Sequence, residues 1–166
     1  MSSALRAARY GFDLVLSTIN TQVGGPTLGH AQAEIIERYR EEFATHHPGR
    51  RPRVAAGRSI LPIVDDHDRR RFGDLAAFYD RFVTPDGGYA DAPGFTGQAS
   101  PLYSGPPEQI IDGLAADPSL ALIDELVLTP LSELDVAQKR DVFTGVVEHI
   151  APHIGWRGAI ASTTSR

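Results

Sequence analysis

The chain contains no cysteine, and its single methionine is Met1. The absence of cysteine excludes disulfide bonds, thiolate nucleophiles and cysteine-ligated zinc sites, and it is compatible with a reducing compartment. No apolar run approaches the roughly 20 residues that a membrane-spanning helix needs. The apolar core of a secretory signal is also missing after Met1. We therefore expect a cytoplasmic protein with no membrane partner.

The chain also lacks an excess of positive charge. Its 166 residues include 16 Lys and Arg against 21 Asp and Glu, which gives a formal net charge of -5. Because nucleic-acid binding depends on basic patches, we expect no nucleic-acid partner. The length and the apolar fraction of 42% are typical of one soluble globular domain. We place this domain at residues 1–156 and expect a flexible tail at residues 157–166.

Apolar and amphipathic segments alternate along the chain. We predict strands at residues 12–18, 53–64, 102–104 and 123–129. We predict helices at residues 4–10, 30–45, 65–83, 107–116 and 136–150, and loops at residues 19–29 and 84–101. The loop at 84–101 is either a lid over a substrate or a mobile connection.

This alternation is typical of a parallel sheet with helical crossovers, so the expected fold class is α/β. A closed (β/α)8 barrel takes about 250 residues, and this chain holds about half of the required units. We therefore predict parallel strands with flanking helices that are too few to close such a barrel.

Arg58 lies within an otherwise apolar predicted strand. A buried guanidinium group needs an anionic partner, which is either a bound ligand or an acidic side chain. Asp13, Asp124 and Glu125 are the acids that we consider for an internal ion pair. The acidic run at residues 65–68 is interpreted as a helix cap, and His149 with His153 as a solvated helix face, so we predict no metal site.

Four short segments form a recognisable series along the chain, namely AARYGFDLVLST (7–18), RSILPIVDDHDRRR (58–71), YSGPPEQII (103–111) and IDELVLTP (123–130). A helix that ends in Ala151-Pro152 follows the last of them. In their order and spacing over residues 3–156, these segments resemble the carboxy-terminal half of the barrel of the bacterial luciferase-like flavin-dependent monooxygenases. The resemblance implies a partial (β/α)8 TIM barrel, with parallel strands and flanking helices, that lacks its amino-terminal half.

The resemblance implies an oxidoreductase that uses O2 and reduced FMN, or a deazaflavin, to oxidise a small organic substrate. It implies that Ser2 and Ser3 contact the flavin phosphate at a helix start. The alternative, which the sequence favours, is that they only cap the helix beside the chain terminus. It also implies that Ser17 and Thr18 lie beside the isoalloxazine ring and that Arg58 meets an anionic group. The resemblance assigns no catalytic residue.

A half barrel leaves two open sheet edges and a large apolar face. One hypothesis is therefore an enzyme fragment that works with a complementing chain carrying the missing half barrel. The alternative is a non-enzymatic truncated half barrel that self-associates into a homo-oligomer. A third hypothesis is a self-contained small α/β binding domain.

Overall fold

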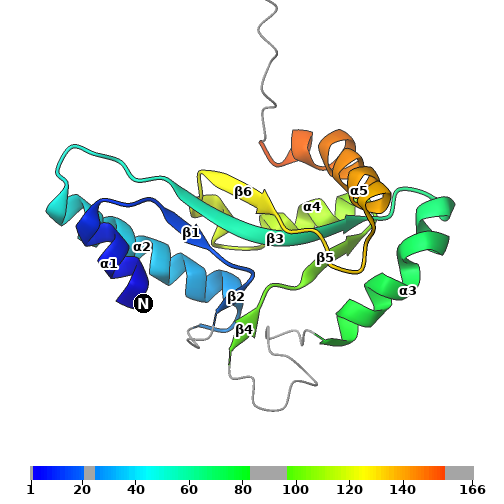
Figure 1. Ribbon diagram of the computed structural model, residues 1–166, viewed down its shortest axis with the longest axis horizontal. Helices are drawn as coiled ribbons and strands as arrows, with labels where there is room; N and C mark the ends of the chain where they lie inside the picture. The colour runs from blue at the N-terminus through cyan, green and yellow to red at the C-terminus, as the bar shows by residue number, and fades with distance from the viewer. Residues whose placement is uncertain (1, 21–24, 83–96, 156–166) are drawn as a thin grey trace, which may run out of the picture.

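The computed structural model describes residues 2–20, 25–82 and 97–155, and its sheet is built around one long strand, β3 (Val54–Pro62). Strands β1 (Leu14–Leu16) and β6 (Glu125–Leu128) both pair with β3 in parallel. Ala55 and Ala56 take part in both pairings, so β1 and β6 lie on opposite edges of β3 (Figure 1). The expected α/β class, with parallel strands and flanking helices, is confirmed.

Strand β5 (Leu102–Gly105) pairs in parallel with the second half of β3, from Ser59 to Pro62. It does not stand between β3 and β6, because β6 pairs directly with the first half of β3. The short strand predicted at residues 102–104 is thus present as β5. The sheet is three strands wide at its start, and the described residues form no closed barrel.

Two short strands form within segments that we predicted as loops. Strand β2 (Ile19–Asn20) pairs antiparallel with β4 (Gln98–Ala99). The loop predictions at 19–29 and 84–101 were wrong at these four residues, because a two-residue strand has no alternating pattern to detect. Residues 84–96 of the predicted lid, and the predicted tail at residues 157–166, lie outside the described residues.

The five predicted helices are all present, with ends within two residues of those expected. They are α1 (Ser2–Tyr10), α2 (Leu28–His46), α3 (Asp66–Phe82), α4 (Pro107–Ala115) and α5 (Val136–His149). Helix α2 begins earlier than predicted because the Thr27 side chain caps it by accepting from His30 N. Within the described residues, none of these helices has the length and apolar character required to cross a membrane.

Helices cover one face of the sheet and leave part of the other face exposed. Val54 packs in a cluster with α1 and α2, and Ile60 packs with α4 and α5. Neighbouring residues of a strand point to opposite faces. On the other face, Val15 of β1 is 73% exposed and Val127 of β6 is 42% exposed. We call this surface the open face, and its residues in the sheet are Val15, Ala55, Gly57, Glu125 and Val127.

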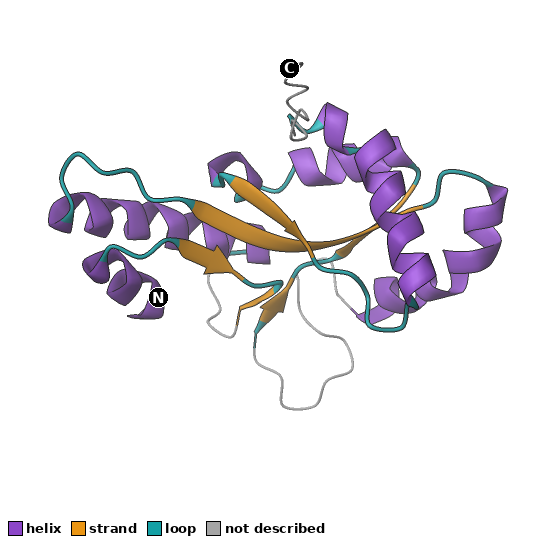
Figure 2. Cartoon of the chain, turned by 45° about the horizontal axis from the view of Figure 1, so that its top comes forward, coloured by secondary structure: helices purple, strands orange, loops and turns teal. Residues whose placement is uncertain are grey.

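The carboxyl end of β3 is covered on both faces. Leu61 points to the same face of β3 as Ala55 and Gly57, but it is fully buried in a cluster with Phe72 and Ala76 of α3. Figures 1 and 2 show β3 running through the middle of the molecule, with α1 and α2 toward its start and α3 and α5 toward its end. The open face is therefore confined to the part of the sheet where β1 and β6 flank β3.

Candidate functional site

Two threonines from different strands meet over a glycine of β3. Thr18 follows β1 and Thr129 follows β6. A Cβ atom at position 57 would lie 3.2 Å from Thr129 Oγ1 and 3.4 Å from Thr18 Cγ2, so the absence of a side chain at Gly57 leaves room for both. We call Thr18, Gly57 and Thr129 the threonine site.

The threonine site lies at the carboxyl ends of parallel strands, where α/β folds place their ligands. It presents one hydroxyl group and one methyl group next to a strand position that has no side chain. A surface that combines an apolar contact with a hydrogen-bonding atom fits the edge of a planar heteroaromatic ring. The site thus offers one hydrogen-bonding oxygen and one apolar contact, whereas a phosphate needs donors from elsewhere.

Ser2 and Ser3 lie in the first turn of α1, and the Ser3 side chain is exposed. Figure 1 shows α1 running against the direction of β1, so the start of α1 lies toward the carboxyl end of the strand. The free N–H groups of a helix start favour an anion. The assignment of both serines to the flavin phosphate stays a prediction.

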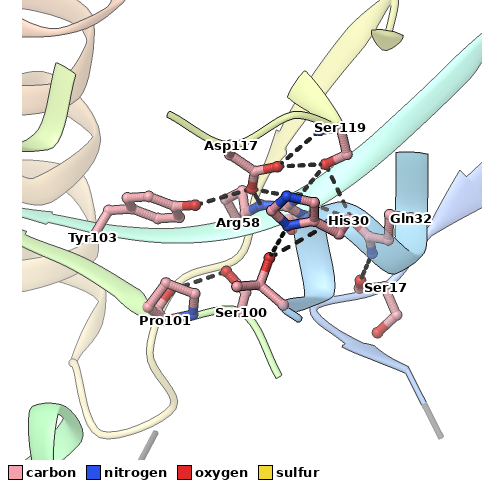
Figure 3. A network of polar contacts seen from close by, with 11 residues as sticks. Ser17, His30, Gln32, Arg58, Ser100, Pro101, Tyr103, Asp117 and Ser119 are labelled. Carbon is pink, nitrogen blue, oxygen red and sulfur yellow. Dashed lines mark hydrogen bonds and ion pairs between the residues drawn. The ribbon is translucent and has the colours of Figure 1, made fainter. Parts of the chain in front are cut away.

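Arg58 is completely buried on the helix-covered face. Its Nε and Nη2 atoms donate to Asp117 Oδ2 at 2.9 and 2.8 Å. Nη2 also donates to Gln32 Oε1 at 2.9 Å and to Ser119 Oγ at 2.7 Å (Figure 3). The sequence left two kinds of partner open for Arg58, a bound anionic ligand or an acidic side chain. The structure shows the acidic side chain. We call Arg58, Asp117, Gln32, Ser119 and Tyr103 the buried network.

The acid in this ion pair is not one of the three that the sequence suggested. Asp124 pairs with Arg51 and Arg40, Glu125 pairs with Arg53, and Asp13 accepts from Arg53 N. These acids lie close to the amino ends of the strands, at positions 13, 124 and 125. The side chain of Arg58 instead meets the turn that follows α4.

Asp117 carries its negative charge inside the protein. Burial opposes ionisation, but the Arg58 guanidinium and the hydrogen bonds from Ser119, Arg58 and Tyr103 outweigh it and lower the pKa of Asp117. Burial and the adjacent Asp117 carboxylate raise the pKa of Tyr103. Tyr103 therefore stays protonated and donates to Asp117 Oδ2 at 3.0 Å. A Cβ atom at Gly29 would overlap Asp117 Oδ1, so the start of α2 packs directly on this carboxylate.

The buried network connects to both sides of the threonine site. Gln32, which accepts from Arg58, donates through Nε2 to the backbone oxygen of Ser17 at 2.7 Å (Figure 3). The backbone oxygen of Arg58 accepts from Thr129 N at 2.9 Å. The structure therefore brings Arg58, Ser17 and Thr18 into one region, with Arg58 behind the sheet and Thr18 on its open side.

Most of these contacts could not be recognised from the sequence. Gln32 interrupts the buried side of α2, next to Leu28, Ile35 and Ile36, and a polar residue at such a position is a usable signal. Asp117 and Ser119 lie in an Asp-Pro-Ser turn, which local rules explain without a distant partner. The residues that sequence reasoning missed are Gln32, Gly57, Tyr103, Asp117, Ser119 and Thr129.

A cavity of about 510 Å³ borders the buried network, and its lining includes His30 of α2, Tyr103 of β5 and Gln109 of α4. The Asp117 carboxylate also reaches its wall, but both oxygens already accept hydrogen bonds from protein groups. Within the described part of the chain, no three His, Asp or Glu side chains are grouped so that they could hold a metal ion.

Neither a protein-family model nor a curated protein matches the chain. Among solved structures, the chain is similar to the crystal structure of the monooxygenase RslO1 from Streptomyces bottropensis, with a TM-score of 0.56 and 15% sequence identity. The match covers 92% of this chain and 45% of RslO1, so the chain spans less than half of that protein's length. At this identity, the similarity shows a shared fold.

Proposed function

We propose that the chain forms one wall of the active site of a luciferase-like, flavin-dependent monooxygenase that oxidises a small organic substrate with O2 and reduced FMN. The observation that carries this proposal is the convergence of Thr18 and Thr129 over Gly57, at the carboxyl end of an open parallel sheet. The four sequence segments and the fold shared with a monooxygenase give further support.

In this proposal, the threonine site contacts the ring of the flavin. Thr129 Oγ1 forms a hydrogen bond at the ring edge, and the methyl group of Thr18 packs against the ring. Ser2, Ser3 and the N–H groups of α1 bind the phosphate. Reduced flavin supplies the electrons for oxygenation, while these residues orient it and exclude water from one side. A deazaflavin would make the same contacts with this wall.

Arg58 acts as a positioning residue rather than as a ligand of the flavin in this proposal. Its guanidinium group is 0% exposed and is occupied by Asp117, Gln32 and Ser119. Through Gln32 it fixes the backbone oxygen of Ser17, the residue before Thr18. The ion pair thereby holds the exit of β1 in the place that the flavin ring requires.

Titration of FMN with the purified chain tests the proposal. We expect saturable quenching of flavin fluorescence in the high micromolar range, because a single wall provides only part of the contacts. The double variant Thr18→Val, Thr129→Val should weaken this binding at least about tenfold. Thr45→Val is the matched control, because Thr45 is exposed on α2 and bonds only within its helix. Fluorescence that shows no saturable change would contradict the proposal.

A second function, a non-enzymatic half barrel that self-associates, is favoured by the exposure of Val15 and Val127 on the open face. Exposed apolar residues grouped on one surface often mark a contact with another polypeptide chain. The two functions predict opposite results when the wild type and the threonine variant are titrated with FMN and their self-association is measured. Self-association without any FMN binding supports the half barrel, and FMN binding that the threonine substitutions weaken supports the monooxygenase.

A further inference from the structure

We infer that the cavity beside the buried network is a second binding site, and that it takes a small organic amine with an apolar body. The inference does not rest on the proposed function, because Thr18, Gly57 and Thr129 are not among the residues that line the cavity. Its wall is formed by the start of α2, the end of α3, strand β5 with the residues before it, and one side of α4.

The apolar part of the wall fits the body of the ligand. Five apolar side chains line the cavity, namely those of Leu28, Pro101, Leu102, Ile110 and Pro118. The volume of about 510 Å³ is typical of pockets that hold small organic molecules. Burial of apolar surface contributes affinity but does not distinguish one charge from another. The polar groups of the wall therefore decide which end group the ligand carries.

The charges of the wall favour a cation. None of the described residues that line the cavity is a lysine or an arginine, whereas two of them are aspartates. Arg58 neutralises Asp117 through their ion pair. Asp80 is exposed on α3 and has no ion pair or hydrogen bond within the described residues. Its carboxylate is therefore available to an ammonium group, which can form a charge-assisted hydrogen bond with it.

The start of α2 does not reverse this preference. The amino end of a helix favours an anion, and residues 27–30 form part of the wall. A protein group already occupies this position, because Asp117 Oδ1 lies where a Cβ atom of Gly29 would be. The positive end of α2 thus meets the Asp117 carboxylate. An anionic ligand in the cavity would be repelled by two aspartates and would find no basic side chain in the described wall.

Tyr103 supplies a hydrogen-bond acceptor beside Asp117. Its hydroxyl group donates to Asp117 Oδ2 at 3.0 Å, and a phenol oxygen can accept a hydrogen bond while it donates one (Figure 3). The side chains of Ser104 and Gln109 also line the cavity, and each carries an acceptor oxygen. An ammonium group has three donors and no acceptor, so it fits a wall that offers these oxygens together with the Asp80 carboxylate.

Isothermal titration calorimetry with three probes tests the charge of the ligand. Benzylamine, benzyl alcohol and benzoate share an aromatic body, and at pH 7 their end groups are cationic, neutral and anionic. We expect benzylamine to bind the chain saturably, with a Kd on the order of 1 mM. Benzyl alcohol should bind at least about threefold more weakly, and benzoate should show no saturation. Equal binding of benzylamine and benzyl alcohol, saturable binding of benzoate, or no saturation by benzylamine would overturn the inference.

Two variants test where the amine binds. Asp80→Asn removes the available charge and should weaken benzylamine binding at least about threefold. Asp74→Asn is the matched control, because Asp74 is an exposed acid of the same helix that does not line the cavity. Tyr103→Phe keeps the ring but removes the acceptor, and should weaken binding at least about twofold. Thermal melts verify that each variant folds. Unchanged affinity in both Asp80→Asn and Tyr103→Phe, or an equal loss in Asp74→Asn, would overturn the inference.

Titration with FMN in the presence of saturating benzylamine distinguishes this cavity from the threonine site. Because the two sites share no lining residue among those described, a chain that binds FMN should still bind it when the cavity is occupied. Benzylamine that displaces FMN would overturn the assignment of a second site. A chain that binds benzylamine but no FMN keeps this inference and refutes the proposed function.

Discussion

The two faces of the sheet differ in how much of each is buried by other parts of the same chain. On the covered face, even a guanidinium group is buried, because Arg58 finds Asp117, Gln32 and Ser119 within the same chain. On the open face, one residue away in the sequence, Gly57 has Thr18 and Thr129 beside it, and Val15 of the neighbouring strand is 73% exposed. The difference shows that the described helices bury one face of the sheet, whereas they bury the other face only where α3 packs on the carboxyl end of β3.

The largest effect should come from breaking the buried network. Arg58→Met removes the cation and leaves Asp117 buried without compensation, which costs about 3–5 kcal/mol of unfolding free energy. Urea unfolding measures this loss. Arg51→Ala is the control, because Arg51 pairs with Asp124 on the surface and its side chain is 79% exposed, so its loss should stay below about 1 kcal/mol. Equal losses for the two variants would show that the network is not buried in solution.

Two neighbouring residues of β1 allow the faces to be compared directly. Leu14 is 8% exposed and Val15 is 73% exposed. Leu14→Ala should destabilise the chain by about 2–5 kcal/mol, because it opens a cavity beneath α1 and α2. Val15→Ala should change stability by no more than about 0.5 kcal/mol in the chain alone. Thermal and urea unfolding give both values, and a large loss at Val15 would mean that the open face is covered.

A smaller effect is expected at the threonine site. Gly57→Ala places a methyl group 3.2 Å from Thr129 Oγ1 and should cost about 1–3 kcal/mol through overpacking. Gly73→Ala is the matched control within α3, where a Cβ atom meets nothing within 4 Å. That change should stabilise the chain by about 0.5–1 kcal/mol. Stabilisation by both substitutions would show that the threonines do not meet over Gly57.

The smallest effect concerns the pH dependence of stability. The pKa of Asp117 is lowered in the folded chain from its usual 3.8, so the unfolded chain binds the proton more readily. The stabilisation is therefore complete above about pH 3.8 and decreases as the pH falls from there through the folded pKa. Unfolding curves between pH 2 and pH 6 should show a steeper loss for the wild type than for Asp117→Asn. Identical slopes would contradict this role of Asp117.

Local patterns predicted most of the fold. All five helices and the parallel direction of β1, β3 and β6 follow from periodicity, caps and the alternation of elements. The position of β5 in the sheet could not be predicted. Strand β3 is long enough for β6 to pair with its first half and β5 with its second half, and no local pattern indicates this division. The antiparallel pair of β2 and β4 joins two segments that are about 80 residues apart and carry no strand pattern.

The candidate site was only partly predictable. The burial of Arg58 and its need for an anion follow from the charge of the side chain and the apolar strand around it. Its partner Asp117 lies 59 residues away in a turn with an adequate local explanation, so the sequence pointed to the wrong acids. Thr129 and Gly57 could not be recognised as parts of one site, because they come together only when β6 pairs with β3.

Hydrogen exchange of the backbone amides tests the central claim, that this sheet is an open arc with two free edges, most directly. In the chain alone, the amides of β3 should be protected along the strand, since β3 has strands on both sides over Ala55 and Ala56. Alternate amides of β1 and β6 should exchange rapidly, because they point away from β3. Protection of β1 and β6 equal to that of β3 would contradict the account, because it would mean that the edges are already paired.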